Sequence, residues 1–258
     1  MTVGEQSSPA AGEMTLFEHL AELRSRIVRM LIALVVGASV GFMLFDPLLE
    51  LLTAPYCDLP RAFRGGPAGE CVLVAGRALE PFSVRMKVSL LFGAFVGGPI
   101  IFYQLYRFIA PGLTAREKRY AVPFVAGSQL LFAAGIAFAF LVIPRGLAIL
   151  LDFGGEGIQP LLSANEYVSF LTLTALAFGL VFELPLVLVL LSLLGIVSCE
   201  GLRRFRPYAL VLNTIVAAVV TPTTDAITLL FMAGPMALFY EFSILASWLI
   251  ERGRRKRT

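Results

Sequence analysis

Residues 15–45 read TLFEHLAELRSRIVRMLIALVVGASVGFMLF. Thr15 followed by Glu18 is a capping-box pattern, which predicts that a helix begins at about residue 15. This helix carries acids and arginines up to residue 29, and it has no charged side chain from residue 30 to 45. An uncharged apolar helix can cross the hydrocarbon core of a bilayer, whereas charged turns stay at an aqueous face. The stretch therefore predicts a helix that starts in water and continues into a membrane.

The whole chain has the composition of an integral membrane protein. Its 258 residues are 58% hydrophobic and only 15% charged, and a mean hydropathy of +0.83 is too high for a water-soluble domain. Residues 1–14 lack the basic and apolar segments of a cleaved signal peptide, so they predict a disordered cytoplasmic tail. With one histidine, three cysteines and no phosphate-loop motif, the sequence offers no ligand set for a metal, haem or nucleotide. We therefore expect no cofactor, no enzymatic activity and no nucleic-acid partner.

Charge-free runs predict six transmembrane helices in one domain, 15–250, followed by a basic cytoplasmic tail, 251–258. The predicted spans are about 27–46, 82–108, 119–143, 166–195, 207–220 and 225–249. Fifteen of the 21 Lys and Arg residues then lie on the side of both termini, so the positive-inside rule makes both termini cytoplasmic. The run 207–220 would be about 21 Å long, short of the roughly 30 Å hydrocarbon core. We therefore expect short fifth and sixth helices with local bilayer thinning.

The segment 46–81 connects the first two predicted spans and is rich in proline and glycine. This composition predicts an ordered cap of short turns more than a strand or a long helix. Cys57 and Cys71 both fall in this segment, on the external and oxidising side of the predicted topology, and are candidates for a disulfide. The alternative is two unpaired small residues. Cys199 is predicted on the reducing side and is assigned no role.

Two acids lie on the predicted cytoplasmic face among many Arg and Lys residues. Taken alone, Glu22 is best interpreted as an i,i+4 ion pair with Arg26, worth about 0.3–0.5 kcal/mol. Glu117 forms a capping box with Thr114 at the start of the third span, so a structural role is available to it as well. Because both are exceptions on a basic face, together they suggest a site for a cationic ligand.

The fourth span carries an acid near its centre. An ionised side chain there costs several kcal/mol, so Glu183 favours a functional role. Pro185 removes a backbone donor and predicts a kink. Thr172 and Thr174, earlier in the same span, have a simple structural interpretation as hydroxyls that donate to the preceding helical turn. Asp225 is either a cap of the sixth helix or a functional residue, and the sequence leaves both open.

Several short motifs occur in order along the chain, namely HLAELR at 19–24, FIAP at 108–111, Glu117, FELP at 182–185, RPY at 206–208, and Thr221-Pro222 with Asp225. Together, from about residue 14 to 250, they resemble the TatC family, the multispanning core of the twin-arginine protein translocase. The resemblance implies a concave, all-α membrane protein of the cytoplasmic (inner) membrane. It implies a receptor for twin-arginine signal peptides and the export of folded proteins, driven by the proton-motive force. The implied partners are single-span TatA- and TatB-type subunits in an oligomeric complex within the lipid bilayer.

The resemblance also implies roles for individual residues. Signal-peptide binding would fall to Glu22, Glu117, Leu23, Arg24 and Phe108. An intramembrane polar role would fall to Glu183, partner docking to Thr221, Asp225 and Thr228, and structural roles to Pro55, Pro111 and Pro185.

One position departs from the family pattern, because many relatives have a glutamine about one turn after the aspartate and this chain has Thr228-Leu229. A polar contact to the partner is then either missing or supplied by Thr228 or Thr221. The alternative function for the whole chain is a proton-coupled small-molecule transporter in which Glu183 titrates.

Overall fold

The computed structural model describes residues 16–57, 71–109, 121–152, 162–220 and 226–255, and all of its regular elements there are helices. The helices are α1 Leu16–Met43, α2 Phe45–Cys57, α3 Glu80–Ile109, α4 Ala121–Asp152, α5 Ala164–Leu193, α6 Cys199–Val220 and α7 Ala226–Arg255. Five of them, α1, α3, α4, α5 and α7, are long and apolar enough to cross a membrane. The prediction of an all-α fold with membrane-spanning helices is confirmed.

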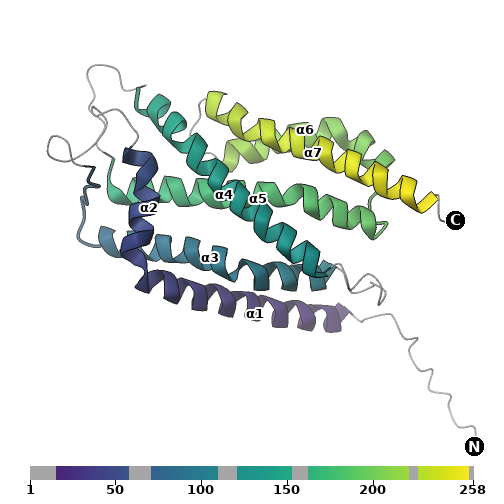
Figure 1. The fold of residues 1–258 in the computed structure, drawn as a ribbon, viewed down its shortest axis with the longest axis horizontal. Coiled ribbons are helices and arrows are strands. Elements are labelled where there is room, and N and C mark those ends of the chain that lie inside the picture. The colour runs from purple at the N-terminus through teal and green to yellow at the C-terminus, as the bar shows by residue number, and fades with distance from the viewer. Residues whose placement is uncertain (1–15, 58–70, 110–120, 153–161, 221–225, 256–258) are drawn as a thin grey trace, which may run out of the picture.

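The long helices form a bundle with α5 near its centre, packed against α3, α4, α6 and α7 (Figure 1). α1 lies along α3, α6 lies along α7, and α4 crosses α3 and α5 obliquely. The short α2 stands across the far ends of α1 and α3. The start of α1 and the end of α7 lie at the same end of the molecule. The helical arrangement thus separates one end that carries both chain ends from another that carries α2.

The core follows α5, which is apolar on all sides, as expected of a helix that neighbours surround. Tyr167, Leu171 and Phe178 of α5 are fully buried. The Tyr167 hydroxyl donates a hydrogen bond to the carbonyl of Leu52 in α2 at 2.8 Å. The ring of Tyr56 lies 5.2 Å from that of Tyr167. These contacts fix α2 against the end of α5.

α1 and α3 approach so closely that glycine is required between them. A Cβ placed on Gly93 of α3 would lie 2.6 Å from both the Ala38 nitrogen and the Leu34 oxygen of α1. A Cβ on Gly37 would lie 2.9 Å from the Gly93 Cα. Small residues at such positions allow backbones to meet, and in lipid this dispersion contact replaces the hydrophobic effect as the force between helices. The first two spans are therefore held by backbone contact.

The expectation of short turns in segment 46–81 is wrong for residues 46–57, which belong to the 13-residue helix α2. Its prolines were interpreted as turn signals. However, Pro47 falls in the first helical turn, where backbone N–H groups have no helical acceptor in any case. Pro55 is the third residue from the C-terminal end of α2 and is buried. Pro47 therefore occupies a position that a helix tolerates, whereas Pro55 costs the last turn of α2 one backbone hydrogen bond.

The expectation of a short sixth helix is wrong, because α7 has 30 residues, whereas α6, with 22, is shorter than the other long helices. The expectation counted only the charge-free runs, whereas both helices continue through charged residues. Some of these residues form hydrogen bonds between α6 and α7. Glu251 accepts a hydrogen bond from the backbone nitrogen of Cys199 at 2.7 Å, and Arg206 donates to Glu241 at 2.5 Å. At about 1.5 Å per residue α6 is about 33 Å long, but its first turns are charged and it is not among the five helices long and apolar enough to cross a membrane, so local bilayer thinning stays a prediction.

The structure joins Cys57, the last residue of α2, to Cys71 by a disulfide with a Cα–Cα distance of 5.6 Å. Protein isolated without reductant should yield a peptide that links these two cysteines, as measured by non-reducing mass mapping. Because the bridge closes a loop of about 15 residues, reduction should lower the free energy of unfolding by up to about 3 kcal/mol. Cys199 is unpaired and buried and serves as the control, since it should react with alkylating reagent only after unfolding. Free thiols at both 57 and 71 in native protein would contradict the pairing.

Candidate functional site

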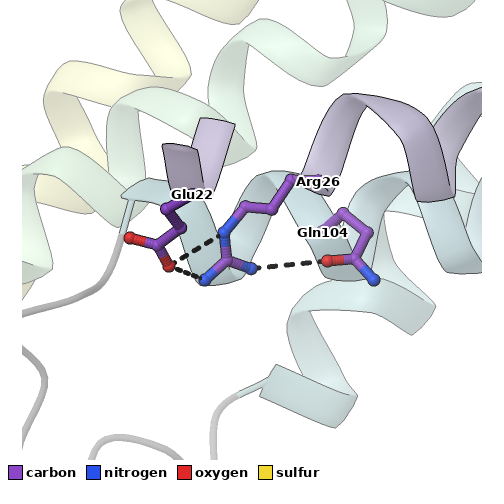
Figure 2. Close-up of polar contacts among 3 residues, drawn as sticks. All are labelled: Glu22, Arg26 and Gln104. Carbon is purple, nitrogen blue, oxygen red and sulfur yellow. Dashed lines mark hydrogen bonds and ion pairs between the residues drawn. The ribbon is translucent and has the colours of Figure 1, made fainter. Parts of the chain in front are cut away.

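A polar cluster joins the start of α1 to the last turns of α3 (Figure 2). The guanidinium of Arg26 donates two hydrogen bonds to one carboxylate oxygen of Glu22, from Nε at 3.0 Å and from Nη2. Its Nη1 donates to Oε1 of Gln104 at 3.4 Å. Arg26 thus lies between an acid of its own helix and an amide of α3.

Because Arg26 is buried, the energetic role of the Glu22–Arg26 pair differs from that of an exposed ion pair. Arg26 is only 6% exposed, and Gln104 is 7% exposed. The estimate of a few tenths of a kcal/mol applies to exposed i,i+4 pairs, which water screens. A buried guanidinium instead requires partners for its N–H groups, and Glu22 and Gln104 accept three of them. The ion pair predicted from the spacing is present, and it is part of the packing between α1 and α3.

Gln104 was missed by sequence reasoning. The signal that identifies it is a lone amide within the charge-free run 88–106, because a polar side chain within a membrane helix usually faces a partner. Only the structure shows that this partner is Arg26.

The structure places the other predicted binding residues unevenly. Leu23 is half-buried beside Glu22, and Arg24 is exposed on the other side of α1 from Arg26. Phe108 is half-buried one turn after Gln104 in α3. Glu117 and Pro111 lie outside the described residues. A two-carboxylate site therefore stays a prediction, with Glu22 as its described half.

Glu183 lies in α5, as predicted, and is 7% exposed. Among the described residues its Oε1 has no hydrogen-bond partner, and the same holds for the buried hydroxyl of Thr174. The Thr172 hydroxyl donates to the Val168 carbonyl at 2.7 Å, so back-bonding is confirmed there. Pro185 is buried within the same continuous helix. This part of α5 thus carries polar atoms that the described helices leave unsatisfied.

The residues expected to dock a partner are only partly described. Thr221 and Asp225 lie outside the described residues, and Thr228 belongs to α7. The loss of the family glutamine next to Thr228 therefore stays a sequence observation.

A second buried acid, Glu80 at the start of α3, was not predicted. Its Oε1 accepts from the backbone nitrogen of Asn165 at 2.7 Å, and its Oε2 accepts from those of Gly76 and Arg77 at 2.8 and 3.2 Å. Lys87 donates to the Asn165 side chain at 2.5 Å. The carboxylate caps the first turn of α5. It also ties the backbone at Gly76 and Arg77, just before α3, to the start of α5. Its role is structural, at the end of the molecule that carries α2.

Comparisons with known proteins agree on one family. The family model of the Sec-independent protein translocase protein (TatC) matches residues 18–235. A TatC protein of Frankia casuarinae is 41% identical over 95% of this chain and 68% of its own length. One of Xylanimonas cellulosilytica is 40% identical over 97% of this chain and 91% of its own length. A crystal structure titled as the twin arginine translocase receptor TatC aligns with 34% identity and a TM-score of 0.74, over 91% of this chain and all of that one.

These matches cover the helices that carry the Glu22–Arg26–Gln104 cluster and the buried Glu183. They confirm the resemblance drawn from the short motifs, and they favour the translocase over the small-molecule transporter. Several apolar helices of spanning length are those of a multi-pass protein of the cytoplasmic membrane. The chain belongs to the TatC family and is a core subunit of the twin-arginine, Sec-independent protein translocase.

Proposed function

We propose that this chain binds the twin-arginine signal peptides of folded cargo proteins and that Glu22 accepts one of the two arginines. The observation that carries the proposal is the placement of the Glu22 carboxylate. It is 25% exposed at the start of α1, and it is held by a guanidinium that is itself buried. A carboxylate fixed in this way loses little conformational freedom when a ligand binds.

Arginine fits such a site better than lysine for a geometric reason. A guanidinium is planar and donates paired parallel hydrogen bonds to carboxylate oxygens, whereas an ammonium acts as a point charge. The Arg26 contact in the structure shows that Glu22 already accepts two guanidinium N–H groups. A second carboxylate, proposed as Glu117, would serve the second arginine of the peptide.

The proposed topology has six spans with both termini in the cytoplasm. It is supported by the start of α1 and the end of α7, which lie at one end of the molecule, and by the excess of Lys and Arg on that side. α6, the fifth span in chain order, is proposed in addition to the five helices that are long and apolar enough to cross a membrane. Its support is a set of large apolar side chains that are 43–60% exposed, as expected of a lipid-facing surface, namely Leu210, Val211, Leu212 and Ile215.

The proposed partners are single-span TatA- and TatB-type subunits, in an oligomeric complex that uses the proton-motive force. A groove of about 340 Å³ between α5, α6 and α7 supports docking of a helix near α6. Asn213 lines this groove, and its buried amide nitrogen has no hydrogen-bond acceptor among the described residues. Thr221, Asp225 and Thr228 are proposed as part of the same docking surface, and Glu183 as part of the concave membrane face.

The test is crosslinking of a signal peptide to photoreactive residues at two exposed positions. Position 21 lies beside Glu22, and position 79 lies at the opposite end of the molecule as a control. A twin-arginine peptide should label position 21 about tenfold more than a twin-lysine peptide, because the paired hydrogen bonds are lost. Neither peptide should label position 79. Equal labelling of position 21 by both peptides would refute the recognition mechanism.

A further inference from the structure

A groove of about 770 Å³ opens between α3 and α4, away from the Glu22–Arg26–Gln104 cluster. Its walls are apolar and include Pro99, Ile100 and Tyr103 of α3 and Val122, Val125 and Leu130 of α4. Val122 and Leu130 are more than 70% exposed, so the groove is open along its length. Nothing in the signal-peptide proposal uses this surface.

At the floor of the groove, a side-chain hydrogen bond connects α4 to α3. Pro99 has no N–H, so the carbonyl of Phe95 lacks its helical donor. The side chain of Gln129 in α4 donates to that carbonyl at 3.0 Å. Gly98 makes room for it, since a Cβ there would lie 2.2 Å from Gln129 Oε1. α3 and α4 are therefore joined at this level.

The length of the groove matches one leaflet of a bilayer. The α3 residues that line the groove run from Phe95 to Tyr103, eight residues apart, or about 12 Å of helix, and Arg107 lies one turn beyond them. Half of a hydrocarbon core of roughly 30 Å is about 15 Å. A helix that crosses the membrane needs the full thickness, so the groove fits lipid chains better than a partner helix or a second copy of this chain.

A positively charged side chain, that of Arg107, lies one turn beyond the last α3 residue of the groove. The guanidinium of Arg107 lies 5.9 Å from the ring centre of Tyr103, which lines the groove. The arginine is exposed, near the end of α3. Basic residues at the mouth of a cleft between membrane helices bind anionic lipid headgroups. We propose that the groove is a binding site for an anionic phospholipid, with an acyl chain between α3 and α4 and the phosphate at Arg107.

The test compares two lipids with the same acyl chains. The purified full chain in detergent is titrated with phosphatidylglycerol or phosphatidylcholine, and bound lipid is counted by native mass spectrometry. Phosphatidylglycerol should bind about fivefold more tightly, and Arg107→Gln should remove that preference. Arg252→Gln is the matched control, because Arg252 lies in a similar way over the ring of Trp248, at 5.1 Å. It should leave the preference unchanged.

A second variant tests the groove itself. Val125→Trp should fill it and weaken both lipids, and a melting curve checks that the variant is folded. A photoreactive residue at position 125 in bilayer nanodiscs should label lipid. A preference that survives Arg107→Gln, equal binding of the two lipids by the unmodified chain, or labelling of a protein at position 125 would overturn the proposal.

Discussion

Gly93→Ala is expected to lower the free energy of unfolding by about 3 kcal/mol, at the upper end of the cost of overpacking. The added methyl carbon would lie 2.6 Å from two backbone atoms of α1, the nitrogen of Ala38 and the oxygen of Leu34. A side chain could rotate away, but backbone atoms within a helix cannot. α1 must therefore move away from α3, and the contacts along the interface would weaken together. Thermal unfolding in detergent should show a fall in Tm of roughly 6–12 °C.

The matched control is Gly253→Ala in α7, an exposed position where an added Cβ meets no atom within 4 Å. Alanine favours helices more than glycine does, by about 1 kcal/mol in a helix interior. The control should therefore be neutral or slightly stabilising, although the chemical change is the same. An equal loss of Tm in both variants would show that the close approach of α1 to α3 does not carry the effect.

Glu22→Gln is expected to weaken binding of a twin-arginine signal peptide about 10- to 100-fold. A hydrogen bond to a charged group contributes about 1.5–3 kcal/mol, and the amide removes the charge. Glutamine keeps a carbonyl oxygen that can accept from Arg26, but it leaves this buried guanidinium without its counter-charge, so some loss of Tm should accompany the loss of binding. Binding of a labelled peptide to the purified chain measures the effect, and a melting curve checks that the fold is retained.

Glu200→Gln provides the control for net charge. Glu200 is an exposed acid in the first turn of α6, next to Cys199, which contacts the end of α7. If Glu22 acts through a local contact, the Glu200 variant should bind the peptide as tightly as the unmodified chain. Similar losses in both variants would mean that the peptide responds to the overall field of this surface.

Much of the fold could be predicted because it depends on local properties. Uncharged runs of spanning length located five of the long helices, and the pairing of Glu22 with Arg26 followed from their i,i+4 spacing. Helix α2 was missed because Pro47 and Pro55 were weighed as turn signals, and a helix tolerates Pro47 only because the helix begins at Phe45, which the sequence did not reveal. The lengths of α6 and α7 were missed because only their charge-free runs were counted, whereas the charged residues at 199–206 and 250–255 are helical as well.

The residues of the candidate site also fall into two groups, those that the sequence predicts and those that only the structure reveals. Glu22 stood out as an acid on a basic face, and Glu183 as an acid within a membrane span. Gln104 and Glu80 did not stand out, because the importance of each comes from a partner on another helix, Arg26 for one and the start of α5 for the other. The sequence alone therefore determined the membrane class, the location of the long apolar helices and the family motifs, all of which depend on residue type and spacing. Only the tertiary structure decided that Arg26 is buried and that α1 and α3 touch through their backbones at Gly93. Burial and close approach depend on which distant segments meet, and the free energy of a buried charge depends on that environment.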